Sequence, residues 1–409
     1  MFSIITLPTW KFLEFTNKEQ LYMRVKPSER TNSVQEYYFS QKLKQIDQMR
    51  KDGADIINLG IGSPDQAPSE STVNRLSEEA KKSNVHGYQS YIGIPALRKA
   101  FAEWYKKYFR VDLDPQSEIL PLIGSKEGIM HISMAYVNEG DEVLVPNPGY
   151  PTYSSVTSLV GGRIRYYDLK EKSGWLPDTD ELEKTDLSGV KIMWVNYPHM
   201  PTGTRGSVKL FENLVSFALR NNILICNDNP YSFILNTDYL SILAVDGAKE
   251  CALELNSLSK SQNMAGWRIG MVAGNSEYIS NILKVKSNMD SGMFLPLQMA
   301  AVESLNCPSS WYEKINEVYG RRRIIVEEIM EILDCKYNKN QVGLFLWGRI
   351  REDIENCSTY VEDILTKAHV FITPGFIFGS NGDRYLRISL CADEKNLLDA
   401  KKRIAAYLG

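Results

Sequence analysis

Residues 252–275 read ALELNSLSKSQNMAGWRIGMVAGN, in which one strand-like run ends at Ser257-Leu258-Ser259-Lys260 and a second begins near Arg268. A lysine directly after an apolar strand is unusual, because a charged amine is costly to bury. Taken alone, the stretch is equally compatible with a surface lysine on a glycine-containing loop. The surrounding sequence therefore has to decide between a buried and a solvated amine.

Short β-branched runs alternate with helix-period segments from Glu118 onward. The candidate helices 126–137 and 208–221 carry apolar residues at spacings of three and four. The strand-like runs are EVLVPNP, RIRYYDL, KIMWVNYP, ILICNDNPY, CALELNSLSK and RIGMVAGN. This alternation predicts an α/β fold with a mostly parallel central sheet between helices.

The two ends of the chain have a different character. Residues 42–51 and 311–333 have the periodicity of helices, and GLFLWGRI and YLRISL are isolated strand patterns. They predict a smaller α+β domain built from both chain ends. We expect the following division: an N-terminal extension at 1–25, a small domain at 26–63 and 301–409, and a large cofactor-binding domain at 64–300.

Composition limits the partners of the protein. The 409 residues are 43% hydrophobic and 24% charged, which excludes a disordered chain, and the formal charge is −3. Such a charge gives no global basic field, so we expect no nucleic acid as partner. The basic run 321–323 is expected to be a solvated or interface face. No apolar run reaches the ~20 residues of a membrane span, so no membrane is expected either.

Cysteine and histidine spacing argues against metal binding. Six cysteines contain no CxxC pair, and four histidines show no HExxH or similar ligand spacing. We therefore expect no metal and reduced thiols in a cytoplasmic protein. The apolar start of the sequence has no cationic region before it, so a signal peptide is not predicted.

Asp228 is the candidate counter-charge for a cationic cofactor. A Schiff-base cofactor enzyme needs a lysine amine, a carboxylate for the pyridinium nitrogen and a phosphate cup. Asp228 ends the apolar run 223–226 within NDNPY, where a charge is costly to bury unless a cation meets it. The alternative is a turn or helix-cap aspartate before Pro230. Tyr231 is positioned either to reach the cofactor or simply to pack.

The phosphate is expected at Gly124-Ser125-Lys126, which opens a helix directly after an apolar run. Backbone N–H groups and the helix dipole at such a start favour an anion. Ser257 and Arg268 would add a hydroxyl and a permanent charge. A GSxxG pattern by itself is equally typical of a capped helix start.

The ordered set Tyr88…Gly93, GSKEG, PNPGYP, PTG, DNPY, SLSK…GWRIG and YLRISL resembles the class I/II aminotransferases of pyridoxal-phosphate fold type I. Within this family, the sequence is similar to the aspartate and LL-diaminopimelate aminotransferases, over residues 26–409. The resemblance implies an enzyme that moves the amino group of an L-amino acid to a 2-oxo acid. It further implies that Lys260 forms the internal aldimine and then acts as the base. Asp228 would pair with the pyridine nitrogen and Tyr231 with O3′.

The resemblance also implies the remaining cofactor contacts and a homodimer. Tyr150 in PNPGYP would stack on the ring, and Tyr88 would reach in from the second subunit of the homodimer. The cofactor-binding residues implied on one subunit are Gly124, Ser125, Lys126, Tyr150, Asn196, Asp228, Tyr231, Ser257, Ser259, Lys260 and Arg268.

Two segments resemble the substrate-binding parts of the family. Arg387 in YLRISL matches the arginine that binds the α-carboxylate, a bidentate task suited to a guanidinium. The alternative is a strand residue that faces solvent. Ile61 and Gly62 in NLGIGSPD resemble the loop that lies over the substrate, where glycine allows close backbone approach. Turn chemistry explains that loop equally well.

Met200 departs from the family pattern. The family usually has asparagine before PTG, where it donates to the cofactor O3′, and methionine cannot donate. Losing one such bond should cost about 1 to 3 kcal/mol and alter the acidity of the aldimine without abolishing cofactor binding, provided that Tyr231 still reaches the oxygen. Asn196, four residues earlier, is the candidate substitute.

Other functions compatible with the same fold stay open. A carbon–sulfur β-lyase shares the cofactor cage and would release pyruvate and ammonia without a second keto acid. A non-catalytic ligand-sensing module of a transcription regulator would need a DNA-binding domain, for which the residues upstream of the matched region are too few. Aspartate, LL-diaminopimelate, alanine, methionine and aromatic amino acids all remain possible donors. Lys286 hints at a distal carboxylate, although a lysine at a helix end is more often solvated.

Overall fold

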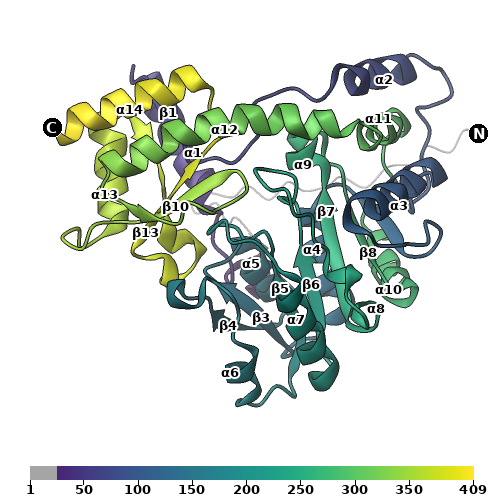
Figure 1. Cartoon of the computed structure of the whole chain (residues 1–409). Helices are drawn as coiled ribbons and strands as arrows, with labels where there is room; N and C mark the ends of the chain where they lie inside the picture. The colour runs from purple at the N-terminus through teal and green to yellow at the C-terminus, as the bar shows by residue number, and fades with distance from the viewer. Residues whose placement is uncertain (1–24) are drawn as a thin grey trace, which may run out of the picture.

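The apolar runs in the middle of the chain form one seven-stranded sheet in the computed structural model, which describes residues 25–409 (Figure 1). Strands β3 to β7 pair in parallel, whereas β8 is antiparallel to both of its neighbours. In spatial order the strands are β2 (Ile119–Leu122), β8 (Gly270–Gly274), β7 (Ala252–Ser257), β6 (Leu224–Asp228), β5 (Val190–Val195), β3 (Glu142–Asn147) and β4 (Arg163–Asp168). The predicted α/β fold with a mostly parallel central sheet is confirmed.

Helices cover both faces of this sheet. Successive side chains of a strand point to opposite faces, and β6 follows this rule: Cys226 packs with α4, α5 and α10, whereas Ile225 packs with α3 and α7. The helices of this region are α2 (Glu70–Ala80), α3 (Pro95–Phe109), α4 (Ser125–Tyr136), α5 (Pro151–Leu159), α6 (Thr179–Glu183), α7 (Val208–Asn221), α8 (Ala248–Cys251), α9 (Leu258–Ser261), α10 (Ser276–Lys286) and α11 (Leu295–Leu305).

Residues 38–58 meet the C-terminal part of the chain in a second, smaller region (Figure 1). Its strands are β1 (Ile57–Asn58) parallel to β11 (Val370–Phe371), and an antiparallel sheet of β12 (Thr373–Pro374), β13 (Tyr385–Ser389), β10 (Phe345–Arg349) and β9 (Lys336–Tyr337). Its helices are α1 (Tyr38–Lys51), α12 (Ser309–Ile332), α13 (Cys357–Asp363) and α14 (Glu394–Leu408). The division at residues 63 and 301 stays a prediction, and residues 1–24 of the expected extension lie outside the described residues.

The arginine run on α12 differs partly from expectation. Arg321 is exposed and pairs with Glu394, as a solvated face requires. Arg322 is only 4% exposed and grips both carboxylate oxygens of Asp65, each at 2.7 Å, so a solvated position was wrong for this residue. The periodicity of α12 turns Arg322 toward the core, because Tyr319 and Val326 are buried on the same helix face.

All six cysteines are buried and free. Among the helices of residues 25–409, none is long and apolar enough to cross a membrane.

Candidate active site

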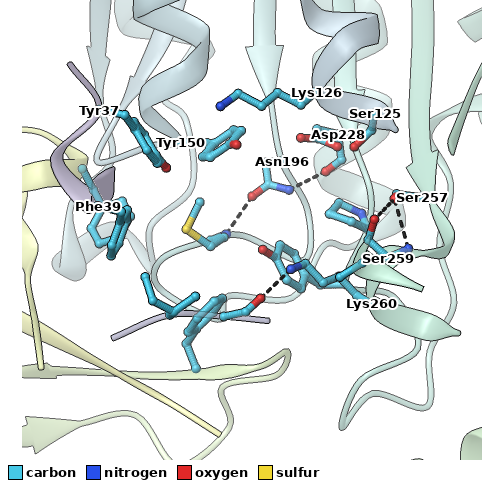
Figure 2. A pocket seen from close by; sticks show the side chains of 18 of the residues that line it. Tyr37, Phe39, Ser125, Lys126, Tyr150, Asn196, Asp228, Ser257, Ser259 and Lys260 are labelled. Atoms are coloured by element: carbon cyan, nitrogen blue, oxygen red, sulfur yellow. Dashed lines mark hydrogen bonds between the residues drawn. The ribbon is translucent and has the colours of Figure 1, made fainter. Parts of the chain in front are cut away.

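A cavity of about 570 Å³ opens where the carboxyl ends of the central strands meet the C-terminal region, the usual ligand position in open α/β sheets (Figure 2). It gathers residues from segments that are far apart in the sequence. The predicted site residues that line it are Ile61, Gly62, Ser125, Lys126, Tyr150, Asn196, Asp228, Tyr231, Ser257, Ser259, Lys260, Arg268 and Arg387. Most of the predicted site is therefore assembled in one place.

The amine of Lys260 points into this cavity. Lys260 lies on α9, the short helix that follows β7, and its Nζ donates a hydrogen bond to the backbone oxygen of Gly62. Burial lowers the pKa of Lys260, and the charges of Arg387 and Arg268 act in the same direction. A lysine with a lowered pKa is present in part as the neutral amine, which is both a nucleophile and a base.

Asp228 ends β6 with one carboxylate oxygen bonded and the other free. Oδ2 accepts a hydrogen bond from the hydroxyl of Tyr153 at 3.1 Å, whereas Oδ1 is buried without a partner. Burial raises the pKa of Asp228 to about 7, opposed by the Tyr153 bond and by Lys260. A buried, unsatisfied oxygen on the cavity wall fits the cationic ring nitrogen of the predicted cofactor.

Tyr153 was missed from the sequence, although it follows Tyr150 by three residues. Residues at this spacing lie on neighbouring positions of a helix surface, and α5 begins at Pro151 directly after Tyr150. This spacing was a usable signal. Tyr153 is fully buried and stacks on Trp194 at a centroid distance of 5.1 Å.

The start of α4 and Arg268 form the predicted phosphate cup. Gly124 has φ +84°, and a Cβ there would lie 2.1 Å from Arg268 Nη2, so only glycine fits. Ser257 and Ser259 share a hydroxyl–hydroxyl bond of 2.8 Å, and Arg268 Nη1 lies 3.4 Å from the Ser259 hydroxyl. No carboxylate in the described part of the chain pairs with Arg268. A helix start, two hydroxyls and a free guanidinium fit a phosphate.

Arg387 is buried, so the solvent-facing alternative was wrong. Its guanidinium is held by neutral groups: Nη2 donates to Gly60 O at 2.8 Å, Nη1 lies 3.2 Å from Met200 Sδ, and Nε has no partner. It also stacks over Phe345 at 3.8 Å. Burial lowers the pKa of Arg387 to about 10, and no acidic side chain among residues 25–409 forms an ion pair with it. The group is therefore available for an incoming carboxylate.

Met200 lines the cavity, in agreement with the cofactor-facing position that the family resemblance implies for the residue before PTG. Its backbone N–H donates to Asn196 Oδ1 at 2.8 Å, and Asn196 Nδ2 donates to the backbone oxygen of Asp228. The Asn196 amide thus uses its oxygen and one hydrogen on the backbone. One amide hydrogen stays available, so the hypothesis that Asn196 substitutes for the missing donor stays a prediction.

Tyr37 and Phe39, which sequence reasoning missed, form the wall opposite Lys260 (Figure 2). Tyr37 directly precedes α1, and Phe39 lies in its first turn. This segment contains no motif, so no local signal identified the two residues. Lys126 extends its amine toward Tyr37, with Nζ 4.9 Å from the ring centroid. Burial lowers the pKa of Lys126, and no carboxylate of the described chain pairs with it.

Three predicted residues lie elsewhere. Gly124 is buried beside Ser125 without lining the cavity, and Tyr88 is 92% exposed and does not line the cavity of its own chain. Lys286 is also outside this cavity. It is 3% exposed and pairs with Asp290 at 2.8 Å, so the expectation of a solvated helix end was wrong.

One acidic cluster has the composition of a metal site. Glu127, His131 and Asp290 bring possible ligand atoms within 4.8 Å of one another. The ammonium of Lys286 already lies beside Asp290 and supplies a cation there. The expectation of no metal stays a prediction.

Comparisons with known proteins agree with one another in the kind of protein that they find. The pattern of the family "Aminotransferase class I and II" matches residues 54–404. The curated LL-diaminopimelate aminotransferase of Aquifex aeolicus is 39% identical over 92% of this chain and 98% of its own, and that of Natranaerobius thermophilus is 39% identical over the same shares. Among solved structures, apo BacF from Bacillus subtilis superimposes with a TM-score of 0.89 at 33% identity, over 94% of this chain and 98% of that one.

Proposed function

This chain belongs to the class I and II aminotransferases, and we propose that its amino donor is LL-diaminopimelate. The observation that carries the proposal is a pair of cations, Arg387 and Lys126, which line the same cavity and form no ion pair within residues 25–409. A donor with a carboxylate at each end supplies a counter-charge for both.

The coarser predictions are confirmed by the family. The protein is a pyridoxal-phosphate-dependent aminotransferase of fold type I, and its substrates are amino acids and 2-oxo acids. The family thus supports transamination over the carbon–sulfur β-lyase alternative.

The donor proposal rests on the different surroundings of the two cations. Arg387 is enclosed by aromatic faces and a thioether, and its planar fork suits the α-carboxylate. Lys126 lies beside the Tyr37 ring, so its ammonium suits the distal carboxylate, while its backbone at the start of α4 suits the phosphate. The curated relatives that carry the name LL-diaminopimelate aminotransferase act on a diacid of this kind.

The residues that would hold pyridoxal phosphate surround Lys260. Asp228 Oδ1 would accept from the ring nitrogen, Tyr150 would stack on the ring, and Tyr231 would donate to O3′. The groups that would hold the phosphate are Gly124, Ser125, Ser257, Ser259 and Arg268. The bound cofactor supplies an electron sink for the pair that remains when the donor loses its α-proton.

The reaction then depends on where protons are held. Arg387 orients the donor by its α-carboxylate, and the apolar walls at Phe39 and Phe345 exclude water from the α-carbon. Lys260 takes the α-proton at Nζ and holds it within the cavity. The lowered pKa of Lys260 increases the neutral fraction of this amine, which a general base requires.

A homodimer would complete each site. Tyr88 is fully presented to solvent, and the apolar residues Tyr91, Met289 and Phe294 close to it in the fold are also exposed. These features support a partner-facing surface from which Tyr88 reaches the partner's phosphate cup. The proposed dimer is tested by mixing inactive Lys260→Ala and Tyr88→Ala proteins, because heterodimers regain one intact site. No recovered activity would contradict the shared site.

The cytoplasmic location stays a prediction, supported by six free thiols.

The proposed donor is tested with a panel of amino acids against 2-oxoglutarate and pyruvate, read by the new amino acid formed. LL-diaminopimelate should give the highest kcat/KM. Lys126→Met should lower this value by about 10- to 100-fold, the equivalent of one charge-assisted hydrogen bond, and leave alanine or methionine unaffected. The control is Lys99→Met on the exposed face of α3, which should change nothing.

Two outcomes would contradict the assignment. A Lys126→Met enzyme that loses diacid and monoacid donors equally would place Lys126 with the cofactor alone. Pyruvate and ammonia formed without a second keto acid would instead indicate the β-lyase. The cofactor assignment itself is tested by borohydride, which should trap the cofactor on Lys260 and not in Lys260→Ala.

A further inference from the structure

A second buried carboxylate, Glu254, lies in the sheet behind the candidate site. It is fully buried on β7, and no lysine, arginine or histidine among residues 25–409 pairs with it. Three donors approach its oxygens: Tyr105 Oη at 2.9 Å on Oε1, and Asn227 Nδ2 at 2.8 Å and the Ile242 N–H at 3.1 Å on Oε2. A buried carboxylate without a cation is costly, so its presence calls for a function.

The geometry of these partners favours the ionised form. Asn227 Oδ1 accepts from the Tyr197 N–H, which fixes the amide with Nδ2 toward Glu254. The Tyr105 oxygen already accepts from Asn256 Nδ2 at 3.3 Å and gives its proton to Glu254. Each of these bonds runs toward a carboxylate oxygen of Glu254, so the partners stabilise the ionised form and oppose the rise in the pKa of Glu254 that burial causes.

Glu254 is one strand away from Asp228. In the β6–β7 pairing, Asn227 lies opposite Glu254 and Asp228 lies opposite Leu255. Asn227 and Asp228 are consecutive, so their side chains point to opposite faces of the sheet. The charge of Glu254 therefore acts on Asp228 through the sheet, and it raises the pKa of Asp228.

We propose that Glu254 is a positioning residue, whose negative charge behind the sheet reinforces Asp228 in holding a proton on the cofactor ring nitrogen. This inference rests on the proposed role of Asp228. Without Glu254, the single carboxylate of Asp228 would have to balance two cations, one at the ring and one at Lys260. A second fixed anion out of reach of solvent stabilises the cationic ring without contacting it, and the three donors keep that anion in place.

The test compares two variants of the cofactor-loaded enzyme. Glu254→Gln removes the charge and keeps the shape, whereas Tyr105→Phe keeps the charge and removes one hydrogen bond. The readout is the pH titration of the absorbance of the Lys260–cofactor linkage. Glu254→Gln should lower its pKa by about 0.5 to 1 unit, because charges on opposite faces of neighbouring strands lie about 10 Å apart and a lost anion destabilises the protonated linkage.

Tyr105→Phe should leave this titration unchanged, even if the enzyme becomes less stable. No shift in Glu254→Gln, or equal shifts in both variants, would overturn the proposal, because both are expected of a merely structural carboxylate. If Glu254→Gln does not fold, infrared spectroscopy of the wild-type holoenzyme tests the same charge. A protonated-carboxyl band that moves in Tyr105→Phe would overturn the proposal, and its absence would support it.

The titration does not depend on the amino donor. A failure of LL-diaminopimelate in the donor panel therefore leaves this inference intact, and a failed titration leaves the proposed donor intact. Borohydride trapping at a lysine other than Lys260 would overturn both.

Discussion

Replacing Asp228 by Asn should stabilise the cofactor-free protein at alkaline pH while weakening cofactor binding. Asn keeps the shape of the side chain and can still accept the Tyr153 hydrogen bond. It removes a buried charge whose second oxygen has no partner until a cofactor is present. The same substitution should therefore have opposite effects on the two forms of the protein.

The magnitude follows from the pKa of Asp228, which burial raises from 3.8 to about 7. The folded protein holds this proton more tightly than the unfolded chain. The contribution of Asp228 to stability is therefore fully present below about pH 4 and is lost as the pH rises to about 7. Each pKa unit corresponds to about 1.4 kcal/mol, so the loss is at most about 4 kcal/mol, and relaxation around the charge reduces it to about 2 to 4 kcal/mol.

The assay is urea denaturation of cofactor-free protein at pH 5 to 9, followed by tryptophan fluorescence. Trp194 reports locally, because it stacks on Tyr153. Asn at 228 should raise the free energy of unfolding by about 2 to 4 kcal/mol at pH 8, with the difference shrinking toward pH 5. Asp246→Asn is the control, since Asp246 is exposed and forms no ion pair. Parallel pH curves for wild type and Asp228→Asn, or a less stable variant at pH 8, would refute the reasoning.

Three further substitutions address the cofactor cage and its support. Met200→Asn should lower the pKa of the Lys260–cofactor linkage, followed by its absorbance, by about 1 unit, because it restores a donor to O3′. Met200→Leu is the control. Equal titrations of the two variants would mean that position 200 does not reach the cofactor. Gly124→Ala should weaken cofactor binding by about 2 to 4 kcal/mol in equilibrium dialysis, from backbone strain and the displaced guanidinium. Gly140→Ala has the same φ of +84° with open space around it, so a matching loss there would contradict this account. Asp65→Asn should lower the free energy of unfolding by about 2 to 4 kcal/mol, because Arg322 is left buried without its partner. Adding Arg322→Met to the same chain should restore most of the lost stability. A double variant as unstable as the single one would be evidence against the buried pair.

Local patterns predicted the fold and most of the cavity. The alternation of strand and helix periods identified six of the seven strands of the central sheet, all but β2, because burial on both faces of a parallel sheet leaves a distinctive apolar run. Three site residues could be predicted from the sequence for a similar reason: Lys260, Asp228 and Gly124. Asp228 ends β6, Gly124 directly precedes α4 and Lys260 lies in the short helix that follows β7, so the residues that impose each position are its immediate neighbours in the chain.

Apart from Tyr153, the positions that were mispredicted or missed depend on contacts across long sequence separations. Arg322 and Lys286 were expected on solvated faces, and both are buried: Arg322 pairs with Asp65, and Lys286 donates to the backbone oxygen of Tyr91. Tyr37 was not identified, because its role depends on Lys126 reaching it from another helix. Helical and strand periodicity gives the direction of a side chain, but it contains no information on which distant element will cover that side.

The sequence by itself determined the α/β class, the family and the lysine, carboxylate and phosphate-binding segments, since these depend on neighbours within a few residues. Only the tertiary structure decided which charges are neutralised and which remain free in the cavity. The electrostatic state of Arg387, Lys126, Asp228 and Glu254 is set by groups far away in the chain, because burial and the distance to a counter-charge are properties of the packed molecule.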